Sequence, residues 1–528
     1  MKSCRRIMLL LGFLAVSCGV QGDEFLPRLN LDLSATTVSG ISSGAFMAVQ
    51  MGVAHSAEIK GVATTAGGPY FCAGEASWSG AAVDKAIARC MQGDPLFPAT
   101  PITDADQKVM QGATESWAAQ GLIDATDNLA RQKVWIFHGY NDGIVKTPVS
   151  DALQTYYRAF TPAHQIFYKH ELPAAHAQIS ASCKASGACN PCATTGGNFI
   201  NSCGVGKTVY DAAGSALQFF YGPLTRTASA ALKGEILPFN QSHFILRDNE
   251  EIAPSRISMA KTGYLYVPGS CKRGETCRLH IAFHGCQQHA EKINLDFVKG
   301  AGFNEWAEKN HIVVLYPQAT SAIAVPFTPL NPNGCWDWWG YNDTGDKMAG
   351  HYATRQGLQI AAVWRMAQFM ALKADGADDE EGDDAGASAD VAADAAETKA
   401  PVAALPKLKA APTVKALDVS SDQVMLVWSP VQNAAAYRVY RLGIAGQEDA
   451  LISPEDFSGT AFVDSGLEAS HDYRYKVVAV GVAGDERAAS KPTGARTAAE
   501  APACDPYFSM LQGHLVDRNN APTNAVCK

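Results

Sequence analysis

The chain has 528 residues, of which 47% are hydrophobic and 18% are charged, and its formal net charge is −9 at pH 7. This length exceeds one ordinary domain and the apolar content supports a large core, so we expect two or three domains. The acidic balance argues against nucleic acid or an anionic membrane surface as a partner, because both attract basic proteins.

The first 22 residues have the pattern of a signal peptide. Three basic residues come first, an apolar run over residues 7–16 follows, and small residues lead to an expected cleavage after Gly22. No later stretch is apolar enough for a transmembrane segment. We therefore predict a secreted, extracellular protein. Lipid attachment at Cys18 and a periplasmic location are the alternatives, although the residues before Cys18 fit a lipidation signal poorly.

The stretch after the leader contains the pattern Gly40-x-Ser42-x-Gly44. Apolar and β-branched residues from Leu31 to Val38 predict a strand before it, and residues 45–51 predict a helix after it. A serine on such a sharp strand-to-helix turn presents its hydroxyl as a nucleophile, and the glycines leave room for the turn. A plain Gly/Ser turn is the alternative, but the flanking elements favour a nucleophile.

Residues 23–373 alternate apolar, β-branched runs with helical stretches. This alternation predicts an α/β domain with a mostly parallel sheet. The clearest expected strands are 133–137, 165–168, 278–283 and 311–316, and the clearest expected helices are 82–91, 104–120 and 357–373.

The composition changes abruptly after this domain. Residues 374–410 are rich in Ala, Asp and Glu and hold few large apolar residues, which predicts a flexible acidic linker. Calcium binding by its acidic run is the alternative, but the run lacks the spacing of a calcium loop.

A second pattern, short alternating strands separated by turn residues, occupies residues 411–498. It predicts a small β-sandwich, with its strongest strands at 424–428, 436–440 and 473–480. Trp428 on an early strand and Tyr473 near the start of a late one are expected core residues that resemble those of a fibronectin type III module. Residues 499–528 form a short tail.

Fourteen cysteines are present, and two of them lie in the leader, which leaves an even number. In an exported chain this predicts disulfides, because the compartment is oxidising. A zinc site at the spacing Cys189-x-x-Cys192 is the alternative for one group, although no second pair of this kind follows. The expected pairs are Cys271–Cys277, Cys72–Cys90 and Cys504–Cys527, with two more among Cys183, Cys189, Cys192 and Cys203.

A serine nucleophile needs a carboxylate and a histidine, which follow it in the order Asp, His in hydrolases with this elbow. Asp142 comes directly after the strand 133–137, so it should lie at the carboxyl edge of the sheet. A turn residue is its alternative role.

The histidine is expected near the next strand, 165–168. His176 lies in a loop of small residues after this strand, whereas His164 and His170 lie at its two ends. We predict Ser42, Asp142 and His176 as the catalytic residues, with no metal and no organic cofactor.

Acyl transfer also needs donors for the oxyanion. The backbone N–H of Ser43 is the first, and the second usually lies in a His-Gly loop that precedes the serine. Here such a loop, His284-Gly285-Cys286, follows the strand 278–283 far downstream. This predicts a circularly permuted α/β-hydrolase in which the Cys286 N–H is the second donor. The Cys286 thiol is expected in a disulfide, with Cys335 as the candidate partner.

Together, Ser42, Asp142, His176 and the motif Phe283-His284-Gly285-Cys286 resemble the extracellular poly(3-hydroxybutyrate) depolymerases with the permuted, type 2 catalytic domain. The resemblance covers nearly all of residues 30–370, and the order of catalytic domain, linker and fibronectin type III module also matches. The tail is shorter than the family's polymer-binding domain. The further matching stretches are 66–70, 201–204, 210–214, 262–268 and 334–341.

The stretch 334–341 is rich in aromatic residues and has two interpretations. The side chains either form a core cluster beside Cys335 or line a cleft that grips an apolar polyester, since aromatic rings offer a large contact area. The candidate substrate contacts are Trp336, Trp338, Trp339 and Tyr341.

The resemblance implies a monomeric, secreted serine esterase that hydrolyses poly(3-hydroxybutyrate) or its oligomers. A feruloyl or acetyl-xylan esterase is the alternative enzyme, because such enzymes use the same chemistry on a related fold. A surface-binding protein with a dead hydrolase domain is the alternative from another class, and the complete set of Ser, Asp and His argues against it.

Overall fold

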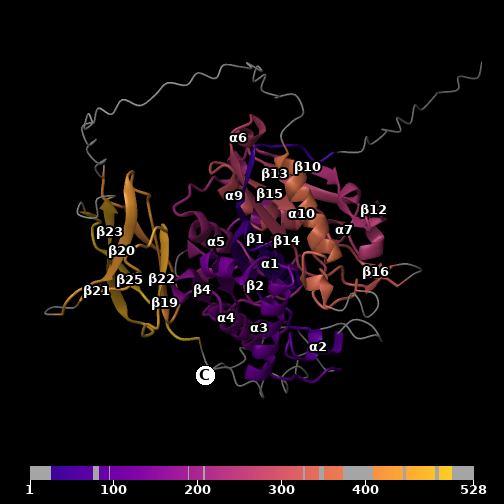
Figure 1. Ribbon diagram of the computed structural model, residues 1–528, viewed down its shortest axis with the longest axis horizontal. Coiled ribbons are helices and arrows are strands. Elements are labelled where there is room, and N and C mark those ends of the chain that lie inside the picture. The colour runs from indigo at the N-terminus through magenta and orange to yellow at the C-terminus, as the bar shows by residue number, and fades with distance from the viewer. Residues whose placement is uncertain are drawn as a thin grey trace, which may run out of the picture.

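The computed structural model describes an α/β domain and a β-sandwich (Figure 1). The signal peptide, nearly all of the acidic linker with its calcium alternative, and the predicted Cys504–Cys527 pair lie outside the described residues. The described residues are 25–74, 83–93, 96–187, 189–205, 208–324, 328–343, 350–372, 408, 410–443, 447–481 and 487–501.

An eight-stranded sheet forms the centre of the α/β domain. Only β13 runs antiparallel to its neighbours, β10 and β15, so the prediction of a mostly parallel sheet is confirmed. In spatial order the strands are β10 (Glu235–Asn240), β13 (Thr262–Val267), β15 (Ile312–Tyr316), β14 (Cys277–Phe283), β1 (Leu31–Ile41), β2 (Ile59–Thr65), β3 (Lys133–Phe137) and β4 (Ile166–Lys169).

The strand order shows the expected permutation. The strands that come late in the chain, β10 to β15, precede β1 to β4 across the sheet. β14 pairs with β1 in parallel, with Gly40 opposite Phe283. The loop after β14 therefore starts beside the end of β1, as the oxyanion loop of an α/β-hydrolase must.

Helices and short strands complete the domain. The helices are α1 (Ser43–Ala54), α2 (Val83–Ala88), α3 (Asp104–Ala119), α4 (Thr147–Arg158), α5 (Ala212–Tyr221), α6 (Gly269–Lys272), α7 (Ala290–Ile293), α8 (Asp296–Gly300), α9 (Phe303–Ala307) and α10 (Leu358–Ala371). The short strands are β5 (Gln178–Ile179), β6 (Asn190–Pro191), β7 (Ile200–Ser202), β8 (Gly204–Val205), β9 (Thr208–Val209), β11 (Leu246–Arg247), β12 (Glu250–Glu251), β16 (Ala322–Ile323) and β17 (Leu330–Asn331).

Two hydrophobic cores lie on the two faces of the sheet, because successive side chains of a strand point to opposite sides. On β3, Val134 and Ile136 belong to the core that α1, α3, α4 and α10 cover. Trp135 and Phe137 belong to the other core, beneath α5 and α9. The apolar run 134–137, which shows no polar alternation, is explained by this burial on both faces.

Element boundaries differ from the predictions where neighbours decide them. β1 continues past Val38 to Ile41, because Ser39 and Gly40 pair with β2 on one side and with β14 on the other. The described part of the helix expected at 82–91 ends at Ala88. β2, β10 and β13 were not among the predicted strands.

The second unit is a two-sheet sandwich of the fibronectin type III kind. Trp428 is completely buried, and the Tyr473 hydroxyl accepts a hydrogen bond from the Glu468 N–H at 2.9 Å, as a tyrosine corner does. One sheet holds β18 (Val414–Val419), β19 (Gln423–Trp428) and β22 (Ala461–Ser465), and the other holds β21 (Ala450–Leu451), β20 (Ala434–Arg441), β23 (Asp472–Gly481), β24 (Arg487–Ala489) and β25 (Thr493–Arg496).

Disulfides join the cysteines of the α/β domain. The pairing of the four cysteines between 183 and 203 into two disulfides leaves no thiolate there for the alternative zinc site. The five pairs, Cys72–Cys90, Cys183–Cys189, Cys192–Cys203, Cys271–Cys277 and Cys286–Cys335, confirm the predicted ones that fall in the described residues.

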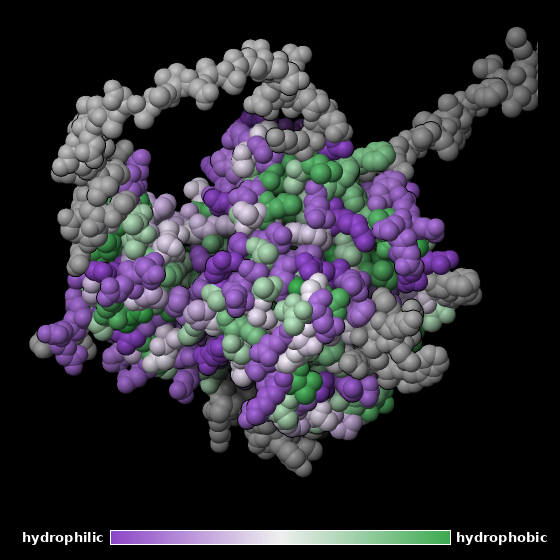
Figure 2. All heavy atoms as spheres, in the orientation of Figure 1, coloured by the Kyte–Doolittle hydropathy of each residue, from purple (hydrophilic) through white to green (hydrophobic). Residues whose placement is uncertain are grey.

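The surface in view is mixed. Figure 2 shows hydrophilic and hydrophobic residues interspersed over this face. The exposed large apolar side chains include Phe25 and Leu96, and also Ile323 and Leu330, which are opposite each other on β16 and β17. In the described part of the chain, every helix is too short or too polar to cross a membrane.

Candidate active site

Ser42 lies on the tight turn between β1 and α1. Its backbone has φ 55° and ψ −125°, a left-handed conformation that is rare for a side chain other than glycine. A Cβ on Gly40 would lie 2.0 Å from the Gly44 oxygen, so the turn requires glycine at that position. The Ser42 N–H donates to the Thr65 oxygen at the end of β2, at 2.9 Å. This is the geometry of a nucleophile elbow.

Asp142 and His176 form a buried pair after β3 and β4. The Asp142 Oδ2 and the His176 Nδ1 are 2.7 Å apart. The other carboxylate oxygen, Oδ1, accepts hydrogen bonds from the N–H groups of Ile144 at 2.9 Å and Val145 at 3.1 Å. Because Nδ1 faces Asp142, Nε2 of His176 is left for a proton transfer.

The charge of Asp142 is maintained by its partners. Burial raises the pKa of this carboxyl, but His176 and the hydrogen bonds outweigh the burial, so the pKa lies below its usual value. Asp142 is therefore ionised at neutral pH and can stabilise a protonated His176.

Three parallel strand ends bring these residues to one edge of the sheet. Hydrogen bonds continue beyond the strands: the Ala66 N–H donates to the Phe137 oxygen and the His138 N–H donates to the Lys169 oxygen, each at 2.9 Å. Since β1, β2, β3 and β4 are consecutive neighbours, the loops of Ser42, Asp142 and His176 emerge side by side.

The two rival histidines are engaged elsewhere. The ring of His164 stacks on Phe462 of the sandwich, with 5.1 Å between ring centres. His170 lies against Tyr168 and Glu171. Of the three histidines, His176 is the one that is hydrogen bonded to Asp142.

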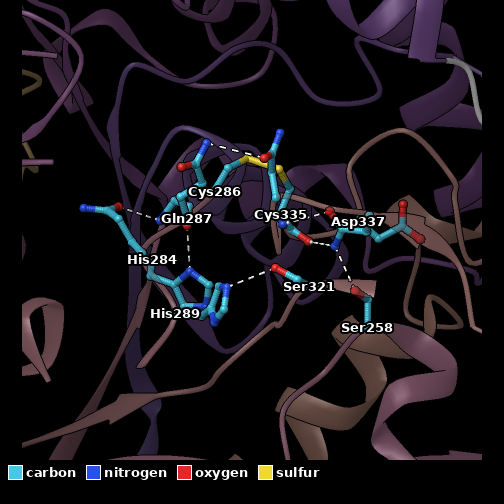
Figure 3. The surroundings of a disulfide bond; sticks show 12 residues. Ser258, His284, Cys286, Gln287, His289, Ser321, Cys335 and Asp337 are labelled. Atoms are coloured by element: carbon cyan, nitrogen blue, oxygen red, sulfur yellow. Dashed lines mark hydrogen bonds between the residues drawn. A yellow bond between two sulfur atoms is a disulfide. The ribbon is translucent and has the colours of Figure 1, made fainter. Parts of the chain in front are cut away.

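The predicted oxyanion loop touches the elbow directly. A Cβ on Gly44 would lie 2.3 Å from the His284 oxygen, and a Cβ on Gly285 would lie 3.3 Å from the Cβ of Ser42. The Cys286–Cys335 disulfide anchors this loop (Figure 3). Among the described residues, neither the Ser43 nor the Cys286 N–H donates a hydrogen bond to another group. Both are free for an oxyanion.

His284 orients the peptide that carries the Cys286 N–H. Its Nε2 accepts from the Ala319 N–H at 3.1 Å, so Nδ1 carries the proton and donates to the Gly285 oxygen at 2.8 Å. Burial lowers the pKa of His284 to about 3, which keeps it neutral. The Gly285 carbonyl and the Cys286 N–H belong to one planar peptide, so the first fixes the direction of the second.

Gln288 links the oxyanion loop to His176, a role that the sequence analysis did not identify. Its Oε1 accepts from the Gly285 N–H at 2.8 Å, and its Nε2 donates to the oxygens of Asn198 and Phe199. The Phe199 ring contacts the His176 ring edge to face, at 6.4 Å between centres. The sequence feature that could have pointed to Gln288 is its position three residues after Gly285.

The aromatic stretch is mostly buried. Trp336 is fully buried, and Trp338 and Trp339 expose 5% and 8% of their surface, which leaves little area for a ligand. Trp338 stacks on Phe46 of α1 at 4.1 Å, and the Tyr341 hydroxyl donates to the Cys335 oxygen. This burial fits the core interpretation, and substrate contact by these four residues stays a prediction.

One group of side chains in the described residues has the spacing of metal ligands: His55, Glu58 and Asp124. A cation already occupies this place, because Arg355 Nη1 lies 2.8 Å from Asp124 Oδ1. Burial and the charge of Arg355 lower the pKa of His55 to about 3. Asp124 is therefore already paired with Arg355, and His55 lies at the far end of α1 from Ser42.

The sheet order, the elbow at Ser42 and the Asp142–His176 pair after the neighbouring strands define an α/β-hydrolase. No family model matches the chain. It is 36% identical over 470 residues to the poly(3-hydroxybutyrate) depolymerase of Delftia acidovorans, with 88% of this chain and 80% of the relative covered. The chain therefore belongs to the poly(3-hydroxybutyrate) depolymerases, a family of carboxylic ester hydrolases.

Three further comparisons agree. The polyhydroxybutyrate depolymerase of Talaromyces funiculosus is 33% identical over 346 residues, which cover 64% of this chain and 90% of the relative. The crystal structure of the PHB depolymerase from Penicillium funiculosum matches with a TM-score of 0.54 and 30% identity, over 66% of this chain and 98% of that one. A structure of a PHB depolymerase variant with a trimer of R3HB, (R)-3-hydroxybutyrate, matches equally well.

Proposed function

We propose that this chain is a secreted serine esterase that hydrolyses poly(3-hydroxybutyrate) or its oligomers, with Ser42, His176 and Asp142 as the catalytic residues. The observation that carries the proposal is the 2.7 Å contact between Asp142 and His176 at the sheet edge where Ser42 forms its elbow. Membership of the depolymerase family, and the R3HB trimer bound to a related structure, support the substrate.

The geometry supports a two-step reaction. His176 Nε2 takes the proton of Ser42 as the serine oxygen attacks the ester carbonyl, and the N–H groups of Ser43 and Cys286 bind the oxyanion. His176 then gives this proton to the departing hydroxyl end of the chain, which leaves an acyl-serine. A water molecule that loses its proton to His176 attacks the acyl carbonyl, and the hydroxy acid leaves as Ser42 regains its proton.

Export is part of the same proposal. The disulfides of the α/β domain form in oxidising compartments, which agrees with the signal-peptide pattern of the first 22 residues. We place the enzyme outside the cell, where a solid or partly degraded polyester is its substrate.

The first test uses the soluble hydroxybutyrate trimer. We expect Ser42→Ala to lower kcat by a factor on the order of 10⁶, because loss of the nucleophile removes the whole covalent route. Ser34→Ala, an exposed serine on the same strand, is the matched control and should hydrolyse the trimer at the normal rate. A Ser42→Ala variant with near-normal hydrolysis would overturn the proposal.

The second test separates polymer from oligomer. We expect purified protein to clear a poly(3-hydroxybutyrate) suspension and to release hydroxybutyrate products identifiable by mass. Cleavage of the trimer without clearing would assign an oligomer hydrolase. Inactivity on both, with release of ferulate or acetate from plant polysaccharide, would replace the proposal by its esterase alternative.

A further inference from the structure

The sandwich packs on the edge of the catalytic sheet. β4 is the last strand of that sheet, and β19 of the sandwich lies against β4 and α5 while β22 lies against α5 (Figure 1). One hydrophobic core runs from Phe167 of β4 and Ala216 of α5 into Met425 and Val463 of the sandwich. All four side chains are at most 1% exposed, so the two units are joined by buried apolar surface as well as by the linker.

Gln423 takes the place of a ninth strand. Its Nε2 donates to the Ile166 oxygen at 3.1 Å, and its Oε1 accepts from the Tyr168 N–H at 2.8 Å. These are the outward-facing backbone groups of an edge strand, which a further strand would pair and which would otherwise be buried without partners. The Gln423 side chain is 1% exposed, so this pairing is sealed from water.

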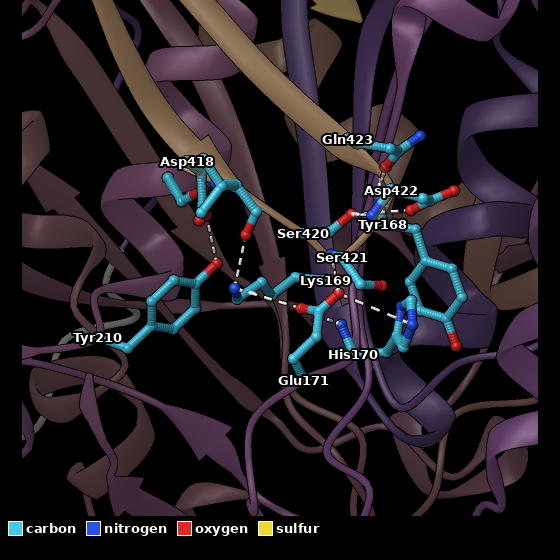
Figure 4. Close-up of polar contacts among 12 residues, drawn as sticks. Tyr168, Lys169, His170, Glu171, Tyr210, Asp418, Ser420, Ser421, Asp422 and Gln423 are labelled. Carbon is cyan, nitrogen blue, oxygen red and sulfur yellow. Dashed lines mark hydrogen bonds and ion pairs between the residues drawn. The ribbon is translucent and has the colours of Figure 1, made fainter. Parts of the chain in front are cut away.

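A buried ion pair lies beside Gln423 (Figure 4). Lys169 Nζ and Glu171 Oε2 are 3.2 Å apart, and each side chain is 5% exposed. The sandwich completes the pair: the Val419 oxygen accepts from Lys169 Nζ and the Ser421 N–H donates to Glu171 Oε1, each at 2.6 Å. Buried charges are stable only when such additional hydrogen bonds satisfy them.

The segment gripped by the sandwich is the one that leads to His176. Its other side bonds to the Asp142 loop: the Tyr140 N–H donates to the Leu172 oxygen at 3.0 Å, and the Asn141 N–H donates to the Ala174 oxygen at 3.2 Å. Residues 169–174 are therefore held between the sandwich and the loop of Asp142. A shift of this segment would change the 2.7 Å contact between Asp142 and His176.

We propose that the sandwich is a positioning element of the active site, acting through Gln423 and Glu171 on the segment that carries His176. This inference rests on the proposed role of His176 and adds to it. The sandwich is then more than a spacer between the catalytic domain and another part of the chain. Its residues cover the edge strand β4 of the catalytic sheet.

Docking is tested without reference to catalysis. A protease site placed in the acidic linker, between residues 374 and 407, allows the full chain to be cut after folding. We expect the two pieces to elute together in size-exclusion chromatography at micromolar concentration, because the buried apolar interface still holds them together after the linker is cut. Separate elution would overturn the proposal, whatever Ser42 does.

Positioning is tested with Gln423→Ala on the soluble trimer. We expect kcat to fall about tenfold with KM within about twofold, because a misplaced base slows the chemical step more than it weakens binding. The matched control is Tyr473→Phe, which loses the Glu468 hydrogen bond inside the sandwich but keeps every contact to β4. An unchanged kcat in Gln423→Ala, or an equal loss in Tyr473→Phe, would overturn the positioning role.

The same kinetic design applies to the ion pair. Glu171→Gln keeps the side chain's shape but removes the charge that faces Lys169. We expect this variant to lower kcat in the same direction as Gln423→Ala, with KM again little changed. An unaltered kcat in both variants, together with co-elution of the cut pieces, would leave a docked sandwich and refute its influence on His176.

Discussion

On one side of Ser42 the oxyanion loop leaves β14, a central strand, whereas on the other side the His176 loop leaves β4, the edge strand. The central loop is anchored within its own domain by the Cys286–Cys335 disulfide and the His284 hydrogen bonds. The edge loop depends on contacts from the sandwich. A strand between two neighbours is positioned by both of them, whereas an edge strand needs a partner from elsewhere.

The two sides also differ in how directly they act on the reaction. The edge contacts act on His176 through the segment 169–174, whereas Ser42 and His176 exchange the proton themselves. For this reason we expect a moderate loss of kcat from the edge contacts and large losses from the residues that touch the reacting atoms.

After the loss of Ser42 itself, the largest effect is expected at the acid–base side. Asp142→Asn should lower kcat on the trimer by about 10⁴, because an amide cannot hold His176 in the required tautomer or stabilise its charge. Asp127→Asn, at an exposed position, is the control and should leave kcat unchanged. Steady-state kinetics give both values, and equal rates in the two variants would contradict the role of Asp142.

The next largest loss of kcat is expected where the oxyanion loop contacts the elbow of Ser42. Gly44→Ala places a methyl group 2.3 Å from the His284 oxygen, which must push the oxyanion loop away from the elbow. We expect kcat to fall by about 10²–10³, as for loss of an oxyanion donor. Gly112→Ala, in α3 with nothing within 4 Å, should instead stabilise the fold by up to about 1 kcal/mol at normal activity. Trimer kinetics and thermal unfolding measure both.

A smaller effect is expected when the disulfide that anchors the oxyanion loop is removed. Replacing Cys286 and Cys335 together by Ser should lower the free energy of unfolding by about 2–5 kcal/mol, since this disulfide closes a 49-residue separation. We expect kcat to fall about tenfold, because the Cys286 N–H remains but is held less firmly. The Cys271–Cys277 pair, which spans 6 residues, is the control. Its removal should change kcat little, and a comparable loss there would refute a special role for the first disulfide.

The smallest effect concerns stability alone. Burial raises the pKa of Asp337 from 3.8 to about 6, although the N–H groups of Asn342, Gly340 and Tyr341 oppose the shift. The folded state thus binds this proton more tightly than the unfolded chain. The contribution to stability is complete below pH 3.8 and is lost as the pH rises through about 6. Asp337→Asn should flatten this part of the stability profile, measured by chemical denaturation. An unchanged slope would contradict the shift.

The local patterns of the sequence determined the chemistry that is available. The elbow at Ser42, the strand before Asp142 and the His-Gly motif after β14 were all visible, because each depends on a few neighbouring residues. Their order along the chain indicated the permutation. Burial on both faces makes 134–137 an uninterrupted apolar run, and β3 has the predicted bounds 133–137.

Only the tertiary structure decided between residues with the same local signal. His164, His170 and His176 all flank one short strand, and the contact with Asp142, 34 residues away, separates them. The same holds for the burial of Trp336 and for Gln423, whose partners lie more than 250 residues earlier. A contact between distant segments depends on how strands are ordered in the sheet, and no local pattern of residues encodes that order.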